Sequence, residues 1–387
     1  MNTIYFDNNA TTNIAPEVLE EMLPYLKEMY GNPSSMHTFG GQLHRKVEEA
    51  RGKVAGLIGA EPEEIIFTSC GTESDNTAIM SAVESLPDKK HIITSRVEHP
   101  AVLNFCKHLK RKGCRITFIQ VDKQGRLKLD ELSKAIDDDT ALVSLMYANN
   151  ETGVIFPLME IGEMLKERGI LFHTDAVQAV GKIPIDLKKL PVDMLSLSGH
   201  KLHAPKGVGA LYVRKGTRFH SYIIGGHQEN GRRAGTENVA SIAGLGKACE
   251  LAGKNLYSEM SYLKGLRDRL ETALLKLCPD AMVNGDTENR LPNTSNISFK
   301  YIDGEAILLR LNEFGVCASS GSACTSGSLA PSHVLKAMDV PATAIHGSVR
   351  FSLSRYNTGA EMEKVVEIMP GIIKELRKLS PYGGGKL

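Results

Sequence analysis

Lys201 and Asp175 each follow an apolar stretch of the sequence that has the character of a buried strand. Lys201 ends the run Ser196–Lys201, and Asp175 lies in the run His173–Ala176. A lysine amine can form a Schiff base with an aldehyde, and a carboxylate can pair with the protonated nitrogen of a pyridine ring. An enzyme that binds pyridoxal 5'-phosphate (PLP) and keeps its ring an electron sink needs both groups. The pair therefore makes the chain a candidate for chemistry on amino acids.

A short run of small and polar residues, Ser69–Glu73, lies between a predicted strand and a predicted helix that includes Ala78 and Val83. A turn of this kind opens a helix with free backbone N–H groups and nearby hydroxyls, which is a common way to hold a phosphate. A plain N-cap at Thr72 is the alternative interpretation of the same residues.

Other polar groups follow further predicted strands. His99 lies at a strand-to-helix junction, where an imidazole could stack on a flat ring or exchange protons near neutral pH; a helix-capping histidine is the simpler alternative. Asn149–Gly153 closes another strand and by itself predicts only a turn. Because ligands of open α/β sheets bind at the carboxyl ends of strands, these groups together predict one site. The remaining members are Gln178, Ser198 and His200, which lie close in sequence to Asp175 or Lys201.

Cys324 lies in the segment Ala318–Ser328, where small residues surround a single thiol. Such a segment cannot bury much surface, so we expect it to be mobile. Cysteine is intrinsically very nucleophilic, and a thiol on a moving loop suits the transfer of a group from an active site to another protein. An incidental thiol on a surface loop is the alternative.

The composition is that of an ordinary globular protein. At 387 residues the chain exceeds the usual length of one domain, so we expect two. The 46 basic and 45 acidic residues leave a formal charge of +1, and no basic field points to nucleic acid or to a membrane surface. We find no secretory signal pattern and no apolar run of about 20 residues, which predicts a cytoplasmic protein. The seven cysteines form no CxxC pair, so most should be small buried hydrophobes.

Apolar runs separated by helical patterns predict an α/β large domain with a mainly parallel, seven-stranded sheet, because such sheets bury both faces of each strand. The last of these runs follows its neighbour after a short connection, so we expect it to be antiparallel. The runs are Ile65–Thr68, His91–Ser95, Ile116–Val121, Leu142–Tyr147, Ile170–Thr174, Met194–Leu197 and Gly209–Val213.

Two amphipathic helices, Pro16–Tyr30 and His44–Ile58, are predicted before the sheet, and a long helical region, Val239–Leu277, after it. We expect the long region to break near Gly253 and Asn255 and to act as a hinge. Beyond it, short strands and helices predict a smaller α+β domain. The expected division is a large domain of residues 15–255 and a small domain of residues 1–14 and 256–387, with a disordered tail.

These motifs resemble those of the cysteine desulfurases, in the branch with a long cysteine loop. The resemblance runs from residue 4 to about residue 381 and is most similar to the nitrogen-fixation type. It is carried by Asp7–Thr12, Gly31–Ser35, Cys70–Asn76, Glu98–His99, Asn149–Glu151, His173–Gln178, Ser198–Lys206, Arg232–Thr236 and Ser319–Thr325.

The resemblance implies a PLP-dependent transferase of fold type I, working as a homodimer. It makes Lys201 the Schiff-base lysine, pairs Asp175 with the pyridine nitrogen, joins Gln178 to the phenolic oxygen and stacks His99 on the ring. It also implies that Asn150 and Arg350 hold the carboxylate of the substrate, a bidentate task that suits a guanidinium. The residues that it places around the phosphate are Gly71, Thr72, Ser198 and His200, together with Thr236 of the other subunit. It counts Gly199 and Asn150 among the other cofactor-binding residues.

The resemblance further implies that L-cysteine is converted to L-alanine while Cys324 takes the sulfur as a persulfide, with Lys201 and His99 handling protons. An iron–sulfur scaffold protein is the expected acceptor, nitrogenase clusters are the expected destination, and Cys324 is the one expected transient ligand of iron. Two alternatives stay open. One is a selenocysteine lyase or an aminotransferase with the same pocket, and the other is a catalytically silent iron–sulfur assembly scaffold.

Overall fold

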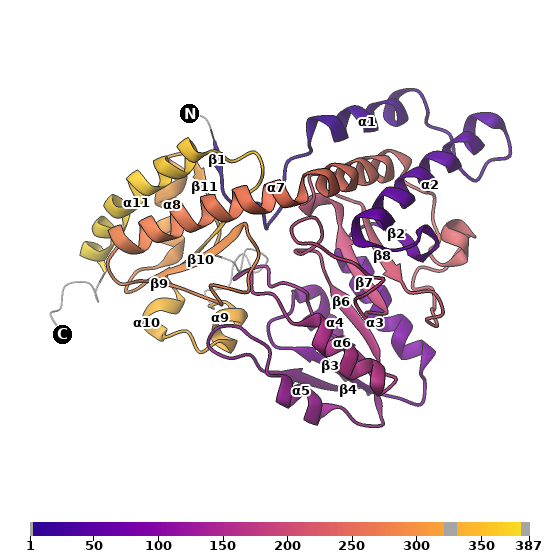
Figure 1. Ribbon diagram of the computed structural model, residues 1–387, viewed down its shortest axis with the longest axis horizontal. Coiled ribbons are helices and arrows are strands. Elements are labelled where there is room, and N and C mark those ends of the chain that lie inside the picture. The colour runs from indigo at the N-terminus through magenta and orange to yellow at the C-terminus, as the bar shows by residue number, and fades with distance from the viewer. Residues whose placement is uncertain (1–2, 321–330, 381–387) are drawn as a thin grey trace.

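The computed structural model describes residues 3–320 and 331–380 (Figure 1). Its larger part is built on a seven-stranded sheet of order β2-β8-β7-β6-β5-β3-β4. Every neighbouring pair is parallel except those of β8, which is antiparallel to both β2 and β7. The predicted mainly parallel sheet with one antiparallel strand is therefore confirmed, with several strand ends moved by a few residues. The strands are β2 Ile65–Thr68, β3 His91–Ser95, β4 Arg115–Ile119, β5 Thr140–Ser144, β6 Leu171–Asp175, β7 Met194–Ser198 and β8 Gly209–Val213.

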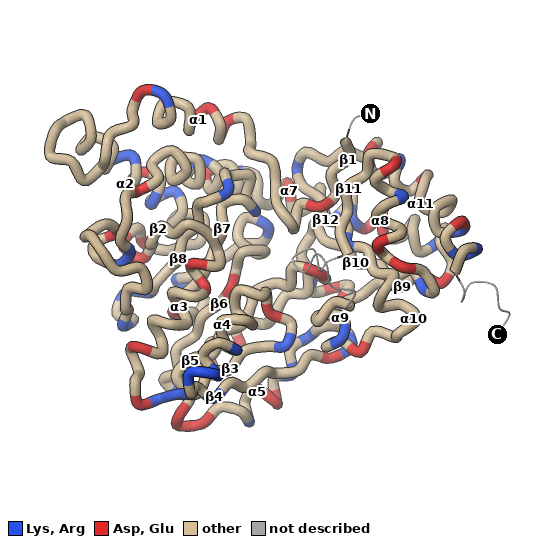
Figure 2. The backbone as a smooth tube through the Cα atoms, turned by 180° about the vertical axis from the view of Figure 1, so that it is seen from behind, with Lys and Arg blue, Asp and Glu red and all other residues tan. Residues whose placement is uncertain are grey.

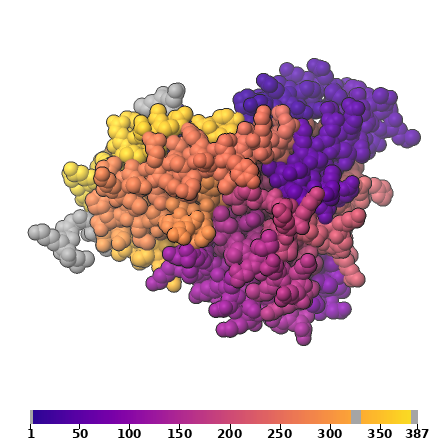
Figure 3. Space-filling model, viewed as in Figure 1, coloured from indigo at the N-terminus to yellow at the C-terminus, as the bar shows by residue number. Residues whose placement is uncertain are grey.

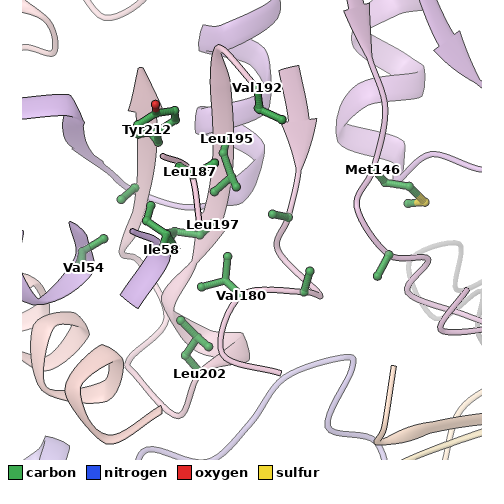
Figure 4. Packing of buried hydrophobic residues seen from close by; sticks show 14 of the residues in the cluster. Val54, Ile58, Met146, Val180, Leu187, Val192, Leu195, Leu197, Leu202 and Tyr212 are labelled. Atoms are coloured by element: carbon green, nitrogen blue, oxygen red, sulfur yellow. The ribbon is translucent and has the colours of Figure 1, made fainter. Parts of the chain in front are cut away.

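Helices cover both faces of this sheet because its strands are apolar on both faces. Successive strand residues point to opposite sides, so Met194 packs in one hydrophobic cluster with α3 and α4 while Leu195 packs in another with α2 and α6. Figure 4 shows Val54 and Ile58 of α2 near Leu195, Leu197 and Tyr212 of the sheet. The helices of this part are α1 Pro16–Lys27, α2 Thr38–Ile58, α3 Gly71–Ser85, α4 Pro100–Arg111, α5 Leu129–Ala135 and α6 Leu158–Glu167.

A third hydrophobic cluster, at the other end of the molecule, includes Phe6, Leu270, Phe351 and Met369. Here β10 lies between the antiparallel strands β9 and β12, and β1 pairs in parallel with β11. Figure 3 shows the C-terminal part of the chain, in orange and yellow, gathered beside the larger lobe. The elements are β1 Ile4–Tyr5, β9 Ala281–Val283, β10 Thr294–Phe299, α8 Gly304–Glu313, β11 Val316–Cys317, α9 His333–Ala337, α10 Ala342–Ile345, β12 Ser348–Ser352 and α11 Gly359–Leu379.

One helix, α7 (Val239–Leu277), runs through both lobes (Figure 1). The break predicted near Gly253 and Asn255 is wrong. Asn255 donates its side-chain amide to Leu251 O in the preceding turn, and Gly253 keeps helical geometry beside Leu57 of α2. A helical glycine costs only about 1 kcal/mol. The helix buries residues in the hydrophobic clusters at both of its ends, which offsets that cost. The division of the chain at residue 255 stays a prediction.

Both signs of charge are dispersed along the chain, as Figure 2 shows. Within residues 3–320 and 331–380, no helix has the length and apolarity that crossing a membrane requires.

Two helical glycines offer a matched test of the packing between α6 and the sheet. A Cβ at Gly162 would lie 2.5 Å from Pro191 O, whereas a Cβ at Gly56 meets nothing within 4 Å. We expect Gly162→Ala to destabilise the protein by roughly 1–3 kcal/mol through overpacking. Gly56→Ala should stabilise it by about 0.5–1 kcal/mol through helix propensity. Urea unfolding of both variants measures the difference; equal stabilities would contradict this account of the packing.

Candidate active site

The carboxyl ends of the parallel strands form one edge of the large sheet, and the predicted site residues collect there. Asp175 is the last residue of β6, and its backbone pairs with Ser196 of the adjacent strand β7. A single turn of 3-10 helix, Gly199–Lys201, follows β7 and carries the lysine. The prediction that Asp175 and Lys201 come from neighbouring strand ends agrees with this topology.

A cavity of about 340 Å³ opens at this edge and has the size of a small-molecule site. Of the residues singled out in the sequence, those that line it are Gly71, Thr72, His99, Asn150, Asp175, Gln178, Ser198, His200, Lys201 and Arg350. Gly199 and Thr236 are not among its lining residues. Gly199 is buried, and a Cβ there would lie 2.9 Å from Val208 Cγ1. Thr236 is exposed. Cys324 lies outside the described residues.

The N-terminus of α3 forms one end of the cavity. Its N-cap residue, Cys70, makes no side-chain capping hydrogen bond, and a Cβ at Gly71 would lie 2.7 Å from Val177 Cγ2. The Ser198 hydroxyl is buried beside it and has no hydrogen-bond partner among the described residues. Uncapped helix N–H groups, a glycine that allows close approach and an unsatisfied hydroxyl together fit a phosphate group. Thr72 therefore lines the cavity without serving as the simple N-cap.

Asp175 is buried and accepts a hydrogen bond from Val177 N at 2.9 Å. Burial is the largest influence and raises its pKa, while the nearby His99 and Lys201 charges oppose that change. A buried carboxylate becomes stable when it gains a cationic hydrogen-bond donor, which the protonated nitrogen of a pyridine ring supplies. The residue therefore fits the ring end of PLP.

His99 is both the N-cap of α4 and part of the cavity wall. Its Nδ1 accepts a hydrogen bond from Ala101 N at 3.1 Å, which places the proton of the neutral imidazole on Nε2. Burial lowers its pKa, so the neutral form is favoured. His99 thus fits both the capping alternative and the ligand-binding prediction, because the capping hydrogen bond fixes its ring at the edge of the cavity.

The amine of Lys201 donates hydrogen bonds to two backbone carbonyls of the N-terminal segment, Asn9 O and Ala10 O, the latter at 2.7 Å. Neither Asn9 nor Ala10 was among the predicted site residues, although Asp7–Thr12 carried part of the family resemblance. Asn9 and Ala10 also line the cavity. Asn9 and Ala10 are far from Lys201 in the sequence, so only the family motif could have indicated that they belong to the site.

Arg350 comes from β12 of the small sheet and reaches the same cavity. Its Nη2 pairs with Asp7 Oδ1 at 2.6 Å, and its Nη1 donates to Asn150 O at 2.9 Å. Its Nε is buried and has no hydrogen-bond partner among the described residues. The site therefore lies where the two lobes meet, and one buried guanidinium faces it from the small lobe.

Both ends of the undescribed segment 321–330 attach beside this cavity. On one side, Ser319 and Arg350 pair through their backbones. On the other, the Ser332 hydroxyl donates to the Glu151 carboxylate at 2.5 Å, and the His333 ring contacts Glu98 O at 3.0 Å. The residue next to Glu98 is His99, and the residue next to Glu151 is Asn150.

Comparison with known proteins identifies the family. Residues 4–365 match the model of the class-V aminotransferases. The chain belongs to that family. It is 61% identical over 382 residues to a cysteine desulfurase of Trichormus azollae, an alignment that covers 99% of this chain and 96% of the relative. It is 56% identical over 386 residues to the cysteine desulfurase NifS of Azotobacter vinelandii, with 100% and 96% covered.

A solved structure described as a NifS-like protein superposes with a TM-score of 0.92 at 41% identity, covering 97% of this chain and 100% of that one. The predicted resemblance to cysteine desulfurases is therefore confirmed, and so is the predicted fold. The assignment to PLP-dependent enzymes is confirmed as well.

Glu98 offers a test of the electrostatics behind His99. Its carboxyl accepts hydrogen bonds from Ser95 Oγ and Met146 N, yet burial raises its pKa to about 8. The folded chain therefore holds a proton that the unfolded chain releases near pH 4.3. The free energy of unfolding should fall by up to ~1.4 kcal/mol per unit as pH rises through this window, roughly 4.3 to 8.

We expect Glu98→Gln to unfold with a weaker pH dependence between about pH 4.3 and 8, because an amide does not titrate. Thermal unfolding at a series of pH values measures this slope. Glu160→Gln, at an exposed position of α6, is the matched control and should keep the wild-type slope. A Glu98→Gln slope equal to that of the control would contradict the assigned burial effect.

Proposed function

We propose that the protein is a PLP-dependent cysteine desulfurase, which converts L-cysteine to L-alanine and receives the sulfur on Cys324 as a persulfide. One observation carries the proposal. A single cavity collects Lys201, Asp175 and His99, and both ends of the Cys324 segment attach beside it. The high identity to cysteine desulfurases over nearly the whole chain supports the same conclusion.

The residues of the cavity fit PLP from one end to the other. The α3 N-terminus would hold the phosphate with the Ser198 hydroxyl and His200, whose pKa burial lowers to about 4 so that the ring stays neutral. Asp175 would pair with the ring nitrogen, Gln178 would donate to the ring oxygen and His99 would stack on the ring. Lys201 is the covalent attachment point. When bound, PLP supplies an electron sink that stabilises negative charge at the α-carbon of the substrate.

Arg350 and Asn150 would bind the substrate carboxylate. Arg350 already faces the cavity, where Asp7 contacts its Nη2 at 2.6 Å and Asn150 O accepts from its Nη1 at 2.9 Å. Planar two-point recognition of a carboxylate is the task for which a guanidinium is best suited. With the carboxylate held there, and once the amine of the substrate has displaced it from its covalent attachment, the Lys201 amine would be free to remove the proton from the α-carbon.

Cys324 would then attack the substrate sulfur as a thiolate. A bond forms between the two sulfurs, the carbon–sulfur bond of the substrate breaks, and its electron pair stays with the carbon skeleton, which takes up a proton. One cysteine and one thiol thus become one alanine and one persulfide, and no external oxidant is needed. His99 and Lys201 are the residues placed to hold or deliver that proton.

We further propose a homodimer. Thr236 does not line the cavity of its own chain, so it can contribute to a phosphate site only in a second copy. Large apolar side chains are exposed among the described residues, including Tyr30, Met36 and Ile224, which is 89% exposed. Exposed apolar side chains of this size are candidates for a protein–protein contact.

The acceptor of the sulfur is proposed to be an iron–sulfur scaffold protein in the cytoplasm, with nitrogenase clusters as the destination. The similarity to NifS of Azotobacter vinelandii supports this assignment. The proposed transient contact of Cys324 with iron belongs to that transfer step.

Two substitutions test the roles of Lys201 and Cys324 separately. Borohydride treatment of the holoprotein should tag Lys201, and the Lys201→Ala protein should carry no tag. Cys324→Ala should keep the tag but form neither alanine nor an added sulfur on the chain after L-cysteine treatment, because the attacking thiol is gone. Mass spectrometry of the peptides and an alanine assay measure both.

Cys317→Ala, in β11, is the matched control and should still form alanine and gain the added sulfur. Full alanine formation by Cys324→Ala would overturn the role of that thiol. Formation of pyridoxamine phosphate and a keto acid in place of alanine would identify an aminotransferase.

The dimer is tested by introducing charge into the exposed apolar surface. Sedimentation of the wild type should give twice the chain mass of 42.2 kDa. Ile224→Asp should favour the monomer and bind PLP several-fold more weakly, because Thr236 of the second copy is then missing. Leu309→Asp also replaces an exposed apolar side chain with an acidic one, but it lies on α8 of the other lobe. This variant should remain a dimer. A wild-type monomer with full PLP affinity would exclude the shared site.

A further inference from the structure

Lys182 is a lysine of the cavity region to which the proposed mechanism assigns no task. It follows β6 by one short turn, and its Nζ donates to Gln178 Oε1 at 2.8 Å and to Asn9 Oδ1 at 3.4 Å. Together with Lys201 it lines a second, small cavity of about 30 Å³ between the two lobes. A lysine held at two acceptors this close to the reactive lysine calls for a physical explanation.

The two neighbours of Gln178 determine which way its amide points. As an ammonium group, Lys182 can only donate, so it requires the oxygen of the amide on its side. Asn9 O can only accept, so it requires the nitrogen, and Gln178 Nε2 lies 3.0 Å from it. The opposite orientation would place donor against donor and acceptor against acceptor. The amide is therefore locked with its NH2 group on the side of Asn9, Lys201 and the large cavity.

Asn9 connects Lys182 to the reactive lysine, Lys201. Its carbonyl oxygen accepts from both Gln178 Nε2 and Lys201 Nζ, while its side-chain oxygen accepts from Lys182 Nζ and Asn293 Nδ2. An NH2 group carries two hydrogens, and among the described residues Asn9 O is the acceptor for one of those on Gln178. The second hydrogen is available to a ligand in the cavity.

We propose that Lys182 is a positioning residue of the active site, which holds the Gln178 amide so that its NH2 group faces the ring oxygen of PLP. The same hydrogen bonds hold Asn9, whose carbonyl receives the Lys201 amine. The inference rests on the proposed function, because PLP is the ligand that supplies the ring oxygen.

An amine is well suited to this task in a partly desolvated position. Burial, followed by the charges of Lys201 and Arg350, lowers the pKa of Lys182 to about 7. A neutral amine still has two N–H groups, which match its two acceptors. Above that pH Asn9 O, which can only accept, still requires the amide nitrogen of Gln178 on its side. The other titratable groups around it are His200 and His203, and Glu259 and Arg355 line the small cavity with it.

The experiment is a double-mutant cycle on PLP binding. Lys182→Met, Gln178→Leu and the double variant are prepared as apoproteins, and the dissociation constant of PLP and the pH midpoint of the bound-cofactor absorbance are measured for each. Lys188→Met, an exposed lysine six residues away that pairs with Glu61, is the matched control. Circular dichroism and thermal unfolding establish that each variant is folded.

We expect Lys182→Met to bind PLP roughly tenfold more weakly and to shift the absorbance midpoint in the same direction as Gln178→Leu, because an orienting hydrogen bond is lost. In the Gln178→Leu background, Lys182→Met should add less than about twofold, the sign that both residues act through one contact. Lys182→Arg, which still donates N–H groups and has the small cavity beside it, should recover most of the affinity.

Additive losses in the double variant, or a Lys182→Met protein with wild-type affinity and midpoint, would overturn the inference. A Lys182→Arg protein that binds PLP about tenfold more weakly than the wild type would also count against it, and this comparison with the wild type decides the question if Lys182→Met does not fold. The proposed function fails separately, since in that case the wild-type apoprotein would not bind PLP at all.

Discussion

Asn9 lies where the two lobes meet, and its polar groups must all form hydrogen bonds there. The geometry of the active site depends on these hydrogen bonds. Its side-chain amide donates to Thr294 Oγ1 of the small sheet at 2.8 Å and to Asn150 O of the large lobe. Its backbone N–H donates to Ser352 Oγ. A buried amide that loses a partner costs about 1–3 kcal/mol, so the segment cannot shift without loss in several places at once. The amine of Lys201 and the amide of Gln178 are positioned against this fixed carbonyl.

Desolvation is the common electrostatic influence on the site. It raises the pKa values of the buried carboxyl groups Asp75, Asp175 and Glu98, and it lowers those of His99 and His173. Each of these groups is thereby shifted toward its neutral form. A charged ligand with a cationic ring nitrogen and an anionic phosphate then provides the partners that stabilise the ionised forms. Asp175 is the residue where this exchange matters most, because it faces the cavity directly.

A chain of hydrogen bonds beneath Asp175 shows how the sheet keeps this region polar without buried charge. His173 contacts Ser144 Oγ and Ser196 Oγ, each at 2.9 Å, with one ring nitrogen for each hydroxyl. Burial lowers the pKa of His173 to about 3, so the ring stays neutral. Two hydroxyls and a neutral imidazole satisfy one another, which is the condition for polar groups inside a core.

The sequence could predict the parts of the site that lie at strand ends, because alternation of apolar residues locates the strands and parallel strands bring their ends together. Asp175, Lys201 and His99 were found in this way. Lys182 could not be, because a lysine that follows Gly181 in a turn has the pattern of an exposed residue. Its partial burial arises from contact with Asn9, far away in the sequence. The predicted break in α7 failed for a similar reason, since the burial of α7 residues in both lobes is not visible in its composition.

Arg350 connects the proposed substrate site with Ser319, which precedes the segment that carries Cys324. Its guanidinium faces the cavity and is held by Asp7 and Asn150, while its backbone pairs with Ser319, at the start of the segment that carries the thiol. A carboxylate that binds this guanidinium is therefore fixed relative to the point from which the segment departs. β12, which carries Arg350, is buried throughout and pairs with β10 along its length, so it holds both contacts in place. In the proposed mechanism the small sheet is thus a common reference for the substrate carboxylate and for one end of the segment that carries Cys324, while the proposed ring-binding residues come from the large lobe.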